Sequence, residues 1–400
     1  MVAEDIDVKY EDAIKRCKPS FRSKLEHSVT LLRKAEGLAK TYDNDDGFFL
    51  AFSGGKDSQA LYHVTKMAGV LFKGHFSPTS VDPPDLIRFI KNEYPTVEWG
   101  HLDFSIYQRA VERRILPTMR VRWCCADFKE TAGAGKVTLI GIRKEESARR
   151  AKRHEVEVSN KKFSGSLDEF EDWSNAEIER KSKRKSKRKI NEDEFSVKSD
   201  SEVHCINGKD SILISPIFDW TEKDIWYFLD KIIGAPHCKL YDEGYTRIGC
   251  ILCPMSSQKS KQRDIERFPH VKRNWIKAIK EIRRGGVFKE EFIWWNIPRD
   301  WMQQTLQRGK CLGQHIASRK LPPPLHLCKT TMGQQTHNTS LRQERCNGFS
   351  ESPASGGVDA GQWTEDEIAE AIFDWWISGK PYKQWYSDKY LQQEIEFDTE

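Results

Sequence analysis

The stretch FFLAFSGGKDSQALYHV, residues 48–64, places a strand-like apolar run directly before a Ser-Gly-Gly turn and a helical pattern. The helix is expected to begin at Lys56 or Asp57. Two successive glycines let the backbone turn so that neighbouring N–H groups point inward, and the start of a helix adds unpaired N–H groups and a positive dipole end. The stretch predicts a corner able to hold phosphate, although an ordinary strand–turn–helix corner has the same outline.

Strand-like and helical segments alternate on both sides of this corner. The strand-like segments are FFLAF (48–52), VLFKGHF (70–76), VEWGHLDF (97–104) and KVTLIGIR (136–143), and a helical pattern follows most of them. Helical periodicity also covers residues 8–42, with a break expected at KPS (18–20). Strands that alternate with helices predict an α/β fold with a doubly wound parallel sheet and helices on both faces.

The chain divides by pattern and composition into five expected parts. They are an N-terminal helical segment (1–44), an α/β domain (45–285) interrupted by a flexible insertion (153–210), a helical connector (286–302), a flexible linker (303–361) and a C-terminal helical segment (362–400). Two helix starts are marked by capping-box spacing, Thr221 with Asp224 and Thr364 with Glu367. The last helix is expected to bury one face formed by Ile368, Ala371, Ile372 and Trp375.

The charge is mild overall but uneven along the chain. Formal net charge is +5, whereas RKSKRKSKRK (180–189) places eight basic residues in ten. Such a run either binds nucleic-acid phosphates through counterion release or is a solvated segment balanced by its acidic flanks. No apolar run reaches bilayer length, and the N-terminus lacks the layout of a secretion signal. We therefore expect a cytoplasmic protein with no membrane partner, and the sequence leaves a homo-oligomer open.

Four of the ten cysteines have the spacing of a metal site. Cys124 and Cys125 are adjacent, and Cys250 and Cys253 form a CxxC pair. Four thiolates can hold a [4Fe–4S] cluster or a structural zinc, and the remaining alternative is buried or redox-active thiols. The other cysteines match no ligand spacing: Cys17 and Cys238 are expected to pack as small hydrophobes, and the rest are Cys205, Cys311, Cys328 and Cys346.

Several ordered motifs resemble one enzyme family. FSGGKDS after a strand resembles the PP-loop of the adenine nucleotide α-hydrolase superfamily. Five further stretches make the chain similar to the phosphoadenosine phosphosulfate (PAPS) reductase family, in particular to prokaryotic members with extra cysteines: TSVDPPDLIRFI, RWCCADFKE, GIRKEESARR, PIFDWTEKDIWYFL and LYDEGYTRIGCILCPM. The similarity covers about residues 45–285, apart from the insertion.

The resemblance implies a set of site residues. The nucleotide-binding residues are Ser53, Gly54, Gly55, Lys56, Asp57, Ser58, Asp82, Arg143, Ser147 and Arg150, and those expected to take part in catalysis are Lys56, Ser58, Arg143 and Arg150. Arg143, Ser147 and Arg150 fit the family's Arg-x-x-x-Ser-x-x-Arg pattern, and guanidinium groups pair bidentately with phosphate or sulfate oxygens. Asp82 either contacts the nucleotide region or caps the helix that follows it.

The same resemblance implies cofactors and substrates. The adjacent pair followed by a distant CxxC resembles the cluster-bearing adenylyl-sulfate reductases, which favours a [4Fe–4S] cluster over zinc. The expected substrate is PAPS or ATP, the latter with Mg²⁺, and the expected chemistry is at the sulfonyl or α-phosphate group in sulfur metabolism. A thiol reductant or a sulfur donor protein would be the partner.

One departure from the family pattern bears on the reaction. The reductases carry their attacking thiol in a Glu-Cys-Gly-Leu-His motif, and this motif does not occur in the sequence. The alternatives are an ATP-dependent enzyme that adenylates and thiolates a nucleic acid, and a nucleotide-sensing protein that binds nucleic acid through residues 180–189.

Overall fold

The computed structural model describes residues 2–159, 162–191, 205–206, 210–284, 364–381, 384–385 and 388–389, without the side chains of 184–191. Two compact units are present: Met1–Ile106 with Met119–Phe268, and Tyr107–Thr118 with Pro269–Glu400. The expected connector (286–302) and linker (303–361), with Cys311, Cys328 and Cys346, lie outside the described residues. Within the described residues, no helix combines the length and the apolar character that a membrane crossing needs.

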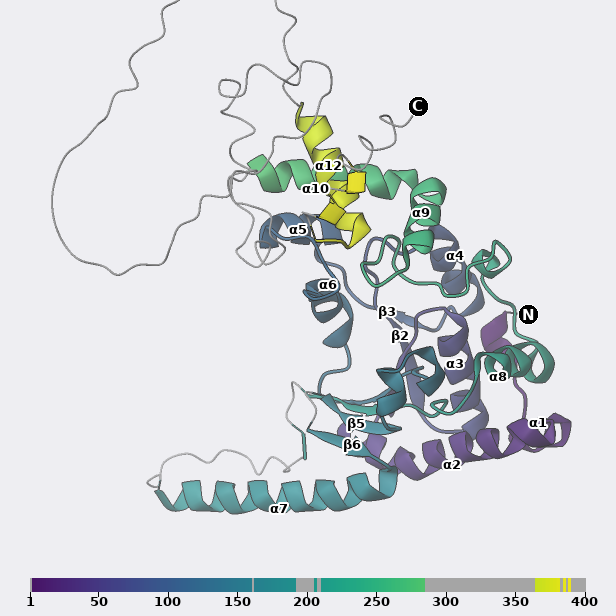
Figure 1. The fold of residues 1–400 in the computed structure, drawn as a ribbon. Coiled ribbons are helices and arrows are strands. Elements are labelled where there is room, and N and C mark those ends of the chain that lie inside the picture. The colour runs from purple at the N-terminus through teal and green to yellow at the C-terminus, as the bar shows by residue number, and fades with distance from the viewer. Residues whose placement is uncertain are drawn as a thin grey trace, which may run out of the picture. The chain divides into compact units, whose positions relative to one another are not determined.

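A seven-stranded sheet forms the centre of the first unit, in the order β3-β2-β1-β4-β7-β5-β6 (Figure 1). Five strands pair in parallel: β1 (Phe48–Ala51), β2 (Phe72–Phe76), β3 (Glu98–Trp99), β4 (Val137–Leu139) and β7 (Ile212–Ile214). The antiparallel strands β5 (Val156–Val158) and β6 (Phe163–Gly165) extend the sheet beyond β7. The α/β prediction is confirmed, and the sheet is mixed rather than wholly parallel.

The expected flexible insertion contains regular structure. Residues 153–210 contribute β5, β6 and the helix α7 (Leu167–Asn191), which extends from the β6 end of the sheet in Figure 1. The described residues of the insertion are therefore largely regular in structure, and its expected flexibility stays a prediction. Strand β5 is too short to show an alternation in sequence, and β7 supplies its backbone partners. Helix α7 is supported by Glu–Lys and Glu–Arg pairs one turn apart rather than by an apolar stripe.

Helices flank the sheet of the first unit. The N-terminal pattern forms α1 (Tyr10–Arg16) and α2 (Pro19–Tyr42), with the expected break at Lys18–Pro19. The other helices of this unit include α3 (Lys56–Ala68), α4 (Pro84–Glu93), α6 (Trp123–Cys125), α8 (Glu222–Tyr227) and α9 (Gln258–Arg267). The Thr221–Asp224 capping box is present at the start of α8. Cys17 and Cys238 are buried, as expected for small hydrophobes.

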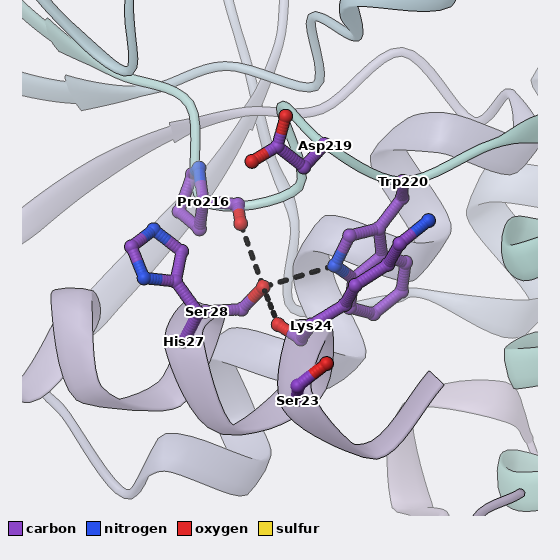
Figure 2. A pocket seen from close by; sticks show the side chains of 7 residues that line it. All are labelled: Ser23, Lys24, His27, Ser28, Pro216, Asp219 and Trp220. Atoms are coloured by element: carbon purple, nitrogen blue, oxygen red, sulfur yellow. Dashed lines mark hydrogen bonds between the residues drawn. The ribbon is translucent and has the colours of Figure 1, made fainter. Parts of the chain in front are cut away.

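A small polar pocket lies between α2 and the loop that follows β7 (Figure 2). The Ser28 hydroxyl is central to it, 2.6 Å from the Pro216 carbonyl oxygen, and it accepts the Trp220 indole N–H at 3.0 Å. The charged residues around it are paired: Lys24 with Asp224, His27 with Glu155 and Asp219 with Lys144. No residue of the loop 53–58 lines this pocket, and the hydrogen bonds of Ser28 hold α2 to the loop that follows β7.

The second unit is helical in its described residues. It contains α5 (Ile106–Arg113), α10 (Pro269–Arg284) and α12 (Glu365–Ser378). The Thr364–Glu367 capping box is present, and the expected face of α12 is buried: Ile368, Ala371, Ile372 and Trp375. The Trp376 ring packs 4.9 Å from that of Trp275, and its indole N–H donates to the Pro117 carbonyl at 2.7 Å. The described tryptophans of the tail therefore serve packing.

Candidate functional site

The loop between β1 and α3 has a backbone that requires glycine. Gly54 adopts a φ of +70°, and a Cβ at this position would lie 2.7 Å from the side chain of Ile90 and 2.8 Å from that of Leu86. Both the left-handed conformation and the close approach of α4 exclude a side chain here. Helix α3 begins at Lys56, as the sequence predicted. The Ser53 hydroxyl donates to that of Ser58 at 3.1 Å, which closes the loop on itself.

Lys56 is buried, with 4% of its surface exposed, and is held by residues far away in the sequence. Its ammonium donates to the Thr246 carbonyl at 2.7 Å and lies 3.4 Å from a Glu222 carboxylate oxygen. Its backbone N–H donates to the Tyr241 hydroxyl at 2.8 Å. Burial raises the pKa of Tyr241, although the bond from the Lys56 N–H acts in the opposite direction. The first turn of α3 is therefore covered by the segment that follows Cys238.

Arg143, just beyond the end of β4, reaches the same turn. Its Nε lies 2.6 Å from Asp57 Oδ1, and its Nη1 lies 3.0 Å from a Glu145 carboxylate oxygen. Burial disfavours the charged guanidinium, but the Asp57 carboxylate outweighs this, so the pKa of Arg143 is raised. The two backbones also approach closely, because a Cβ at Gly141 would lie 3.2 Å from the Asp57 carbonyl oxygen. The loop 53–58 and the start of the arginine motif thus converge.

The rest of the arginine motif forms two short turns rather than one helix. These are Lys144–Glu146 and Arg150–Lys152. The Ser147 hydroxyl accepts the Arg150 backbone N–H at 3.2 Å, and the Arg150 guanidinium pairs with the Glu146 carboxylate. Arg143 and Arg150 are therefore both paired with carboxylates of the chain. Any anion that they bind must compete with these partners or join them.

Asp82 lies near the start of α4 but does not cap it. Its carboxylate accepts the backbone N–H of Thr79 at 2.6 Å, and the N-cap position of α4 is Pro83, without a side-chain cap. The helix-cap alternative for Asp82 was wrong, because the carboxylate instead closes the turn 79–82 that precedes the helix. This turn lies beside the CxxC pair, since the Val81 carbonyl accepts the Ile251 N–H at 2.8 Å.

The four cysteines from the two spaced pairs interact electrostatically, although 124 residues lie between the pairs. A hydrogen bond from Cys124 and the nearby Arg122 lower the pKa of Cys125 to about 5, against the effect of burial. Burial raises the pKa of Cys253, and the charges of Cys250 and Cys125 add to this.

Two cations lie against this cysteine group. Arg122 donates to Cys125 Sγ at 3.0 Å, and Lys129 donates to Cys250 Sγ at 3.2 Å. Cations in these positions offset the negative charge that thiolates carry. In the part of the chain that the structure describes, no three or more Cys, His, Asp or Glu side chains stand in an arrangement that could hold a metal ion.

Sequence patterns missed the residues that cover the loop. Tyr241, Thr246 and Glu222 all contact Lys56, but they follow it by more than 160 residues. The available signal was the stretch LYDEGYTRIGC, which contains Tyr241 and Thr246. Nothing in that stretch indicates which of its side chains turns toward the loop, because this depends on the path of the chain after α8.

Comparison with known proteins gives a domain match and several distant relatives. The phosphoadenosine phosphosulfate reductase domain matches residues 47–256, more than half of the chain. Two uncharacterised proteins of Methanocaldococcus jannaschii are each 23% identical, over 71% and 72% of this chain. The chain spans only 59% and 53% of their own lengths. A Candida glabrata FMN adenylyltransferase structure overlaps 64% of this chain and 76% of its own, at 14% identity and a TM-score of 0.34.

Proposed function

This chain belongs to the phosphoadenosine phosphosulfate reductase family, and from that premise we propose that it is a PP-loop enzyme that binds an adenine nucleotide at residues 53–58. The observation that carries the proposal is the convergence of a glycine-dependent loop, the start of α3 and the buried Arg143, which pairs with Asp57. A loop that turns at Gly54 into a helix N-terminus presents backbone N–H groups to a phosphate.

Both charged and hydroxyl side chains would contribute to phosphate binding. Lys56 and Arg143 are buried and paired with carboxylates, so they fix the shape of the loop and add positive charge beside it. Ser53 and Ser58 offer hydroxyl groups from the loop itself. Ser147 and Arg150 would complete the site from the turns that follow β4. Asp82 would stabilise the turn 79–82 rather than contact the nucleotide.

The reaction follows from which nucleotide is bound. With ATP and Mg²⁺, an acceptor oxygen attacks the α-phosphorus, its bond to the bridging oxygen breaks, and pyrophosphate leaves. With PAPS, a thiolate attacks the sulfonyl sulfur, the bond from sulfur to the phosphate oxygen breaks, and adenosine bisphosphate leaves. The second course requires a thiol reductant or sulfur donor protein, because the sequence lacks the family's Glu-Cys-Gly-Leu-His motif. The PAPS course would place the chain in sulfur metabolism, and the ATP course would do so where the adenylated acceptor is then thiolated.

We further propose that Cys124, Cys125, Cys250 and Cys253 hold a [4Fe–4S] cluster, with zinc as the alternative. Support comes from the interacting thiols and from the two cations beside them, Arg122 and Lys129. When bound, such a cluster supplies a fixed charge near the nucleotide site. The chain's own part is to hold the CxxC turn: buried Asp264 accepts the Leu252 N–H at 3.0 Å and the Tyr245 hydroxyl at 3.3 Å.

A turnover experiment tests the proposed function. Anaerobically purified protein is mixed with ATP or with PAPS and a thiol donor, and AMP, pyrophosphate and sulfite are measured. We expect turnover of one nucleotide that falls at least tenfold in Lys56→Ala and Ser58→Ala and is unchanged in Lys40→Ala, which alters an exposed residue of α2. Turnover that survives in the two loop variants would contradict the assignment of the site.

A nucleic-acid acceptor or a nucleotide-sensing protein is the second candidate, and the basic run 180–189 is the feature that favours it. The run 180–189 lies on the helix α7, where Arg180 and Lys183 are paired with Glu177 and Glu179. A sensor would bind ATP without turnover. If the run contacts nucleic acid, replacing its lysines and arginines by glutamine should flatten the salt dependence of binding, and an unchanged slope would show that it is not the contact.

A further inference from the structure

Residues 241–248, here called the strap, lie against the loop 53–58. The strap contacts the first residue of α3 twice, through the Tyr241 hydroxyl on the Lys56 N–H and through the Thr246 carbonyl on the Lys56 ammonium. It also approaches Gly55, where a Cβ would lie 3.5 Å from the Tyr241 hydroxyl oxygen and 3.9 Å from the Ile248 carbonyl oxygen. The strap therefore closes over the corner that is proposed to receive phosphate.

The bond from Lys56 to Tyr241 uses a donor that a phosphate would need. The N–H of the first residue of a helix has no partner within the helix, and phosphate oxygens are bound by such groups. Here the acceptor is a phenol oxygen at 2.8 Å. Burial raises the pKa of Tyr241, so the phenol is neutral at physiological pH. A charged phosphate oxygen is the stronger acceptor for the same N–H.

We propose that the Tyr241 hydroxyl occupies, at the Lys56 N–H, the position that a phosphate oxygen takes, and that it is displaced when the nucleotide binds. The inference rests on the proposed nucleotide site and adds the residue that sets its selectivity. Only a ligand that offers an anionic oxygen to the Lys56 N–H forms a stronger hydrogen bond there than the phenol does. Tyr241 thereby lowers the affinity for ATP and requires that the ligand carry phosphate.

The surroundings of Tyr241 provide a direct signal of this displacement. Its ring stands edge-on to that of Trp226 in α8, with the centroids 5.0 Å apart and the planes at 90°. The centroid of the His237 ring lies 6.2 Å from that of Tyr241 and 5.6 Å from that of Trp226. Movement of the Tyr241 ring changes the environment of the Trp226 indole. The fluorescence of Trp226 should therefore change when ATP binds.

Calorimetric titration of the full chain tests the affinity. Wild type, Tyr241→Phe and Tyr227→Phe are titrated with ATP, with inorganic pyrophosphate and with adenosine. Tyr227 is the matched control, because its hydroxyl also accepts a backbone N–H, that of Lys18 at 3.1 Å, away from the loop 53–58. Losing one competing hydrogen bond, worth about 1 kcal/mol, should tighten ATP and pyrophosphate binding in Tyr241→Phe by about 3- to 10-fold. Tyr227→Phe should bind as wild type does, and the affinity for adenosine should not differ among the three proteins.

Fluorescence titrations of the wild type and of Trp226→Phe with ATP give a readout that requires no change at Tyr241. The change on adding ATP should be present in the wild type and absent from Trp226→Phe. The inference is overturned, and the proposed function stands, if ATP binds but Tyr241→Phe binds it equally or more weakly, or if the Trp226 signal stays constant. Failure of the wild type to bind ATP or pyrophosphate would overturn both the inference and the ATP form of the proposed function.

Discussion

Arg143 Nε lies 2.6 Å from Asp57 Oδ1 and joins the segment after β4 to the first turn of α3. The two residues are 86 positions apart in sequence, and the Arg143 side chain is 4% exposed. The guanidinium also reaches Glu145 and the carbonyl of Trp220. The position of the loop helix therefore depends on one arginine that is shared by three segments of the chain.

Replacing Arg143 should destabilise the fold as well as the site. Arg143→Ala leaves the Asp57 carboxylate without its buried partner, and such a loss costs about 3 kcal/mol where both groups are buried. Asp57 is 22% exposed, so we expect about 2 kcal/mol less free energy of unfolding, measured by urea denaturation. The control is Arg149→Ala, an exposed arginine of the same segment, which should change it by less than about 0.5 kcal/mol. Equal stability of the two variants would argue against a structural role for Arg143.

Gly54→Ala should damage the loop. The φ of +70° costs an alanine about 1 kcal/mol, and overlap with Ile90 and Leu86 adds about 1–3 kcal/mol. The free energy of unfolding should fall by about 2–4 kcal/mol, together with nucleotide binding. Gly37→Ala is the matched control, since no atom lies within 4 Å of its Cβ position in α2, and it should raise stability by up to about 1 kcal/mol. A Gly54→Ala protein as stable as wild type would show that the loop can rearrange.

The buried His63 predicts a loss of stability in acid. It is 2% exposed, its Nε2 lies 3.0 Å from the Tyr94 hydroxyl oxygen, and burial, with a smaller effect of Lys66, lowers its pKa to about 3. The unfolded chain protonates this histidine near pH 6.5. Between these values the unfolded state binds the extra proton, so stability is complete above pH 6.5 and falls as the pH drops toward 3.

The measurement is the free energy of unfolding between pH 7 and pH 4 for wild type and His63→Gln. The wild type should lose up to about 3 kcal/mol more than the variant over this range, because the variant has no imidazole to protonate. His101, whose side chain is 87% exposed, supplies the control His101→Gln, which should follow the wild-type curve. Parallel curves for all three proteins would mean that His63 titrates normally in the folded state.

The proposed cluster predicts iron that depends on four particular cysteines. Anaerobic protein should be brown and contain about four irons per chain. Cys124→Ser and Cys250→Ser should lose most of this iron, whereas Cys238→Ser, which alters a buried thiol outside the cysteine group, should keep it. A colourless protein with one zinc would replace the cluster by the structural-zinc alternative.

Local features were predicted well from the sequence. The start of α3, the break before Pro19 and both capping boxes follow from side chains within a few residues of one another. The loop follows β1 and Arg143 follows β4, and these paired parallel strands bring their carboxyl ends to one edge of the sheet. The family resemblance was confirmed by the domain match over residues 47–256.

Long-range pairing could not be predicted in the same way. Arg143 was expected to be available for phosphate or sulfate, and the structure pairs it with Asp57 and Glu145. Tyr241 reaches Lys56 only because the chain after α8 folds back over the loop. Strand β5 is three residues long, and its place in the sheet depends on the partner β7 rather than on a pattern of its own. Such contacts depend on the course of the whole chain.

The claim that an adenine nucleotide binds at residues 53–58 is tested most directly by thermal unfolding of the anaerobic full chain with ATP or PAPS. The account predicts a melting temperature that rises with ligand concentration, equivalent to about 2.7 kcal/mol at 100 times the dissociation constant, and no such rise in Gly54→Ala. A melting temperature that neither nucleotide changes at millimolar concentration, or an equal rise in Gly54→Ala, would contradict it.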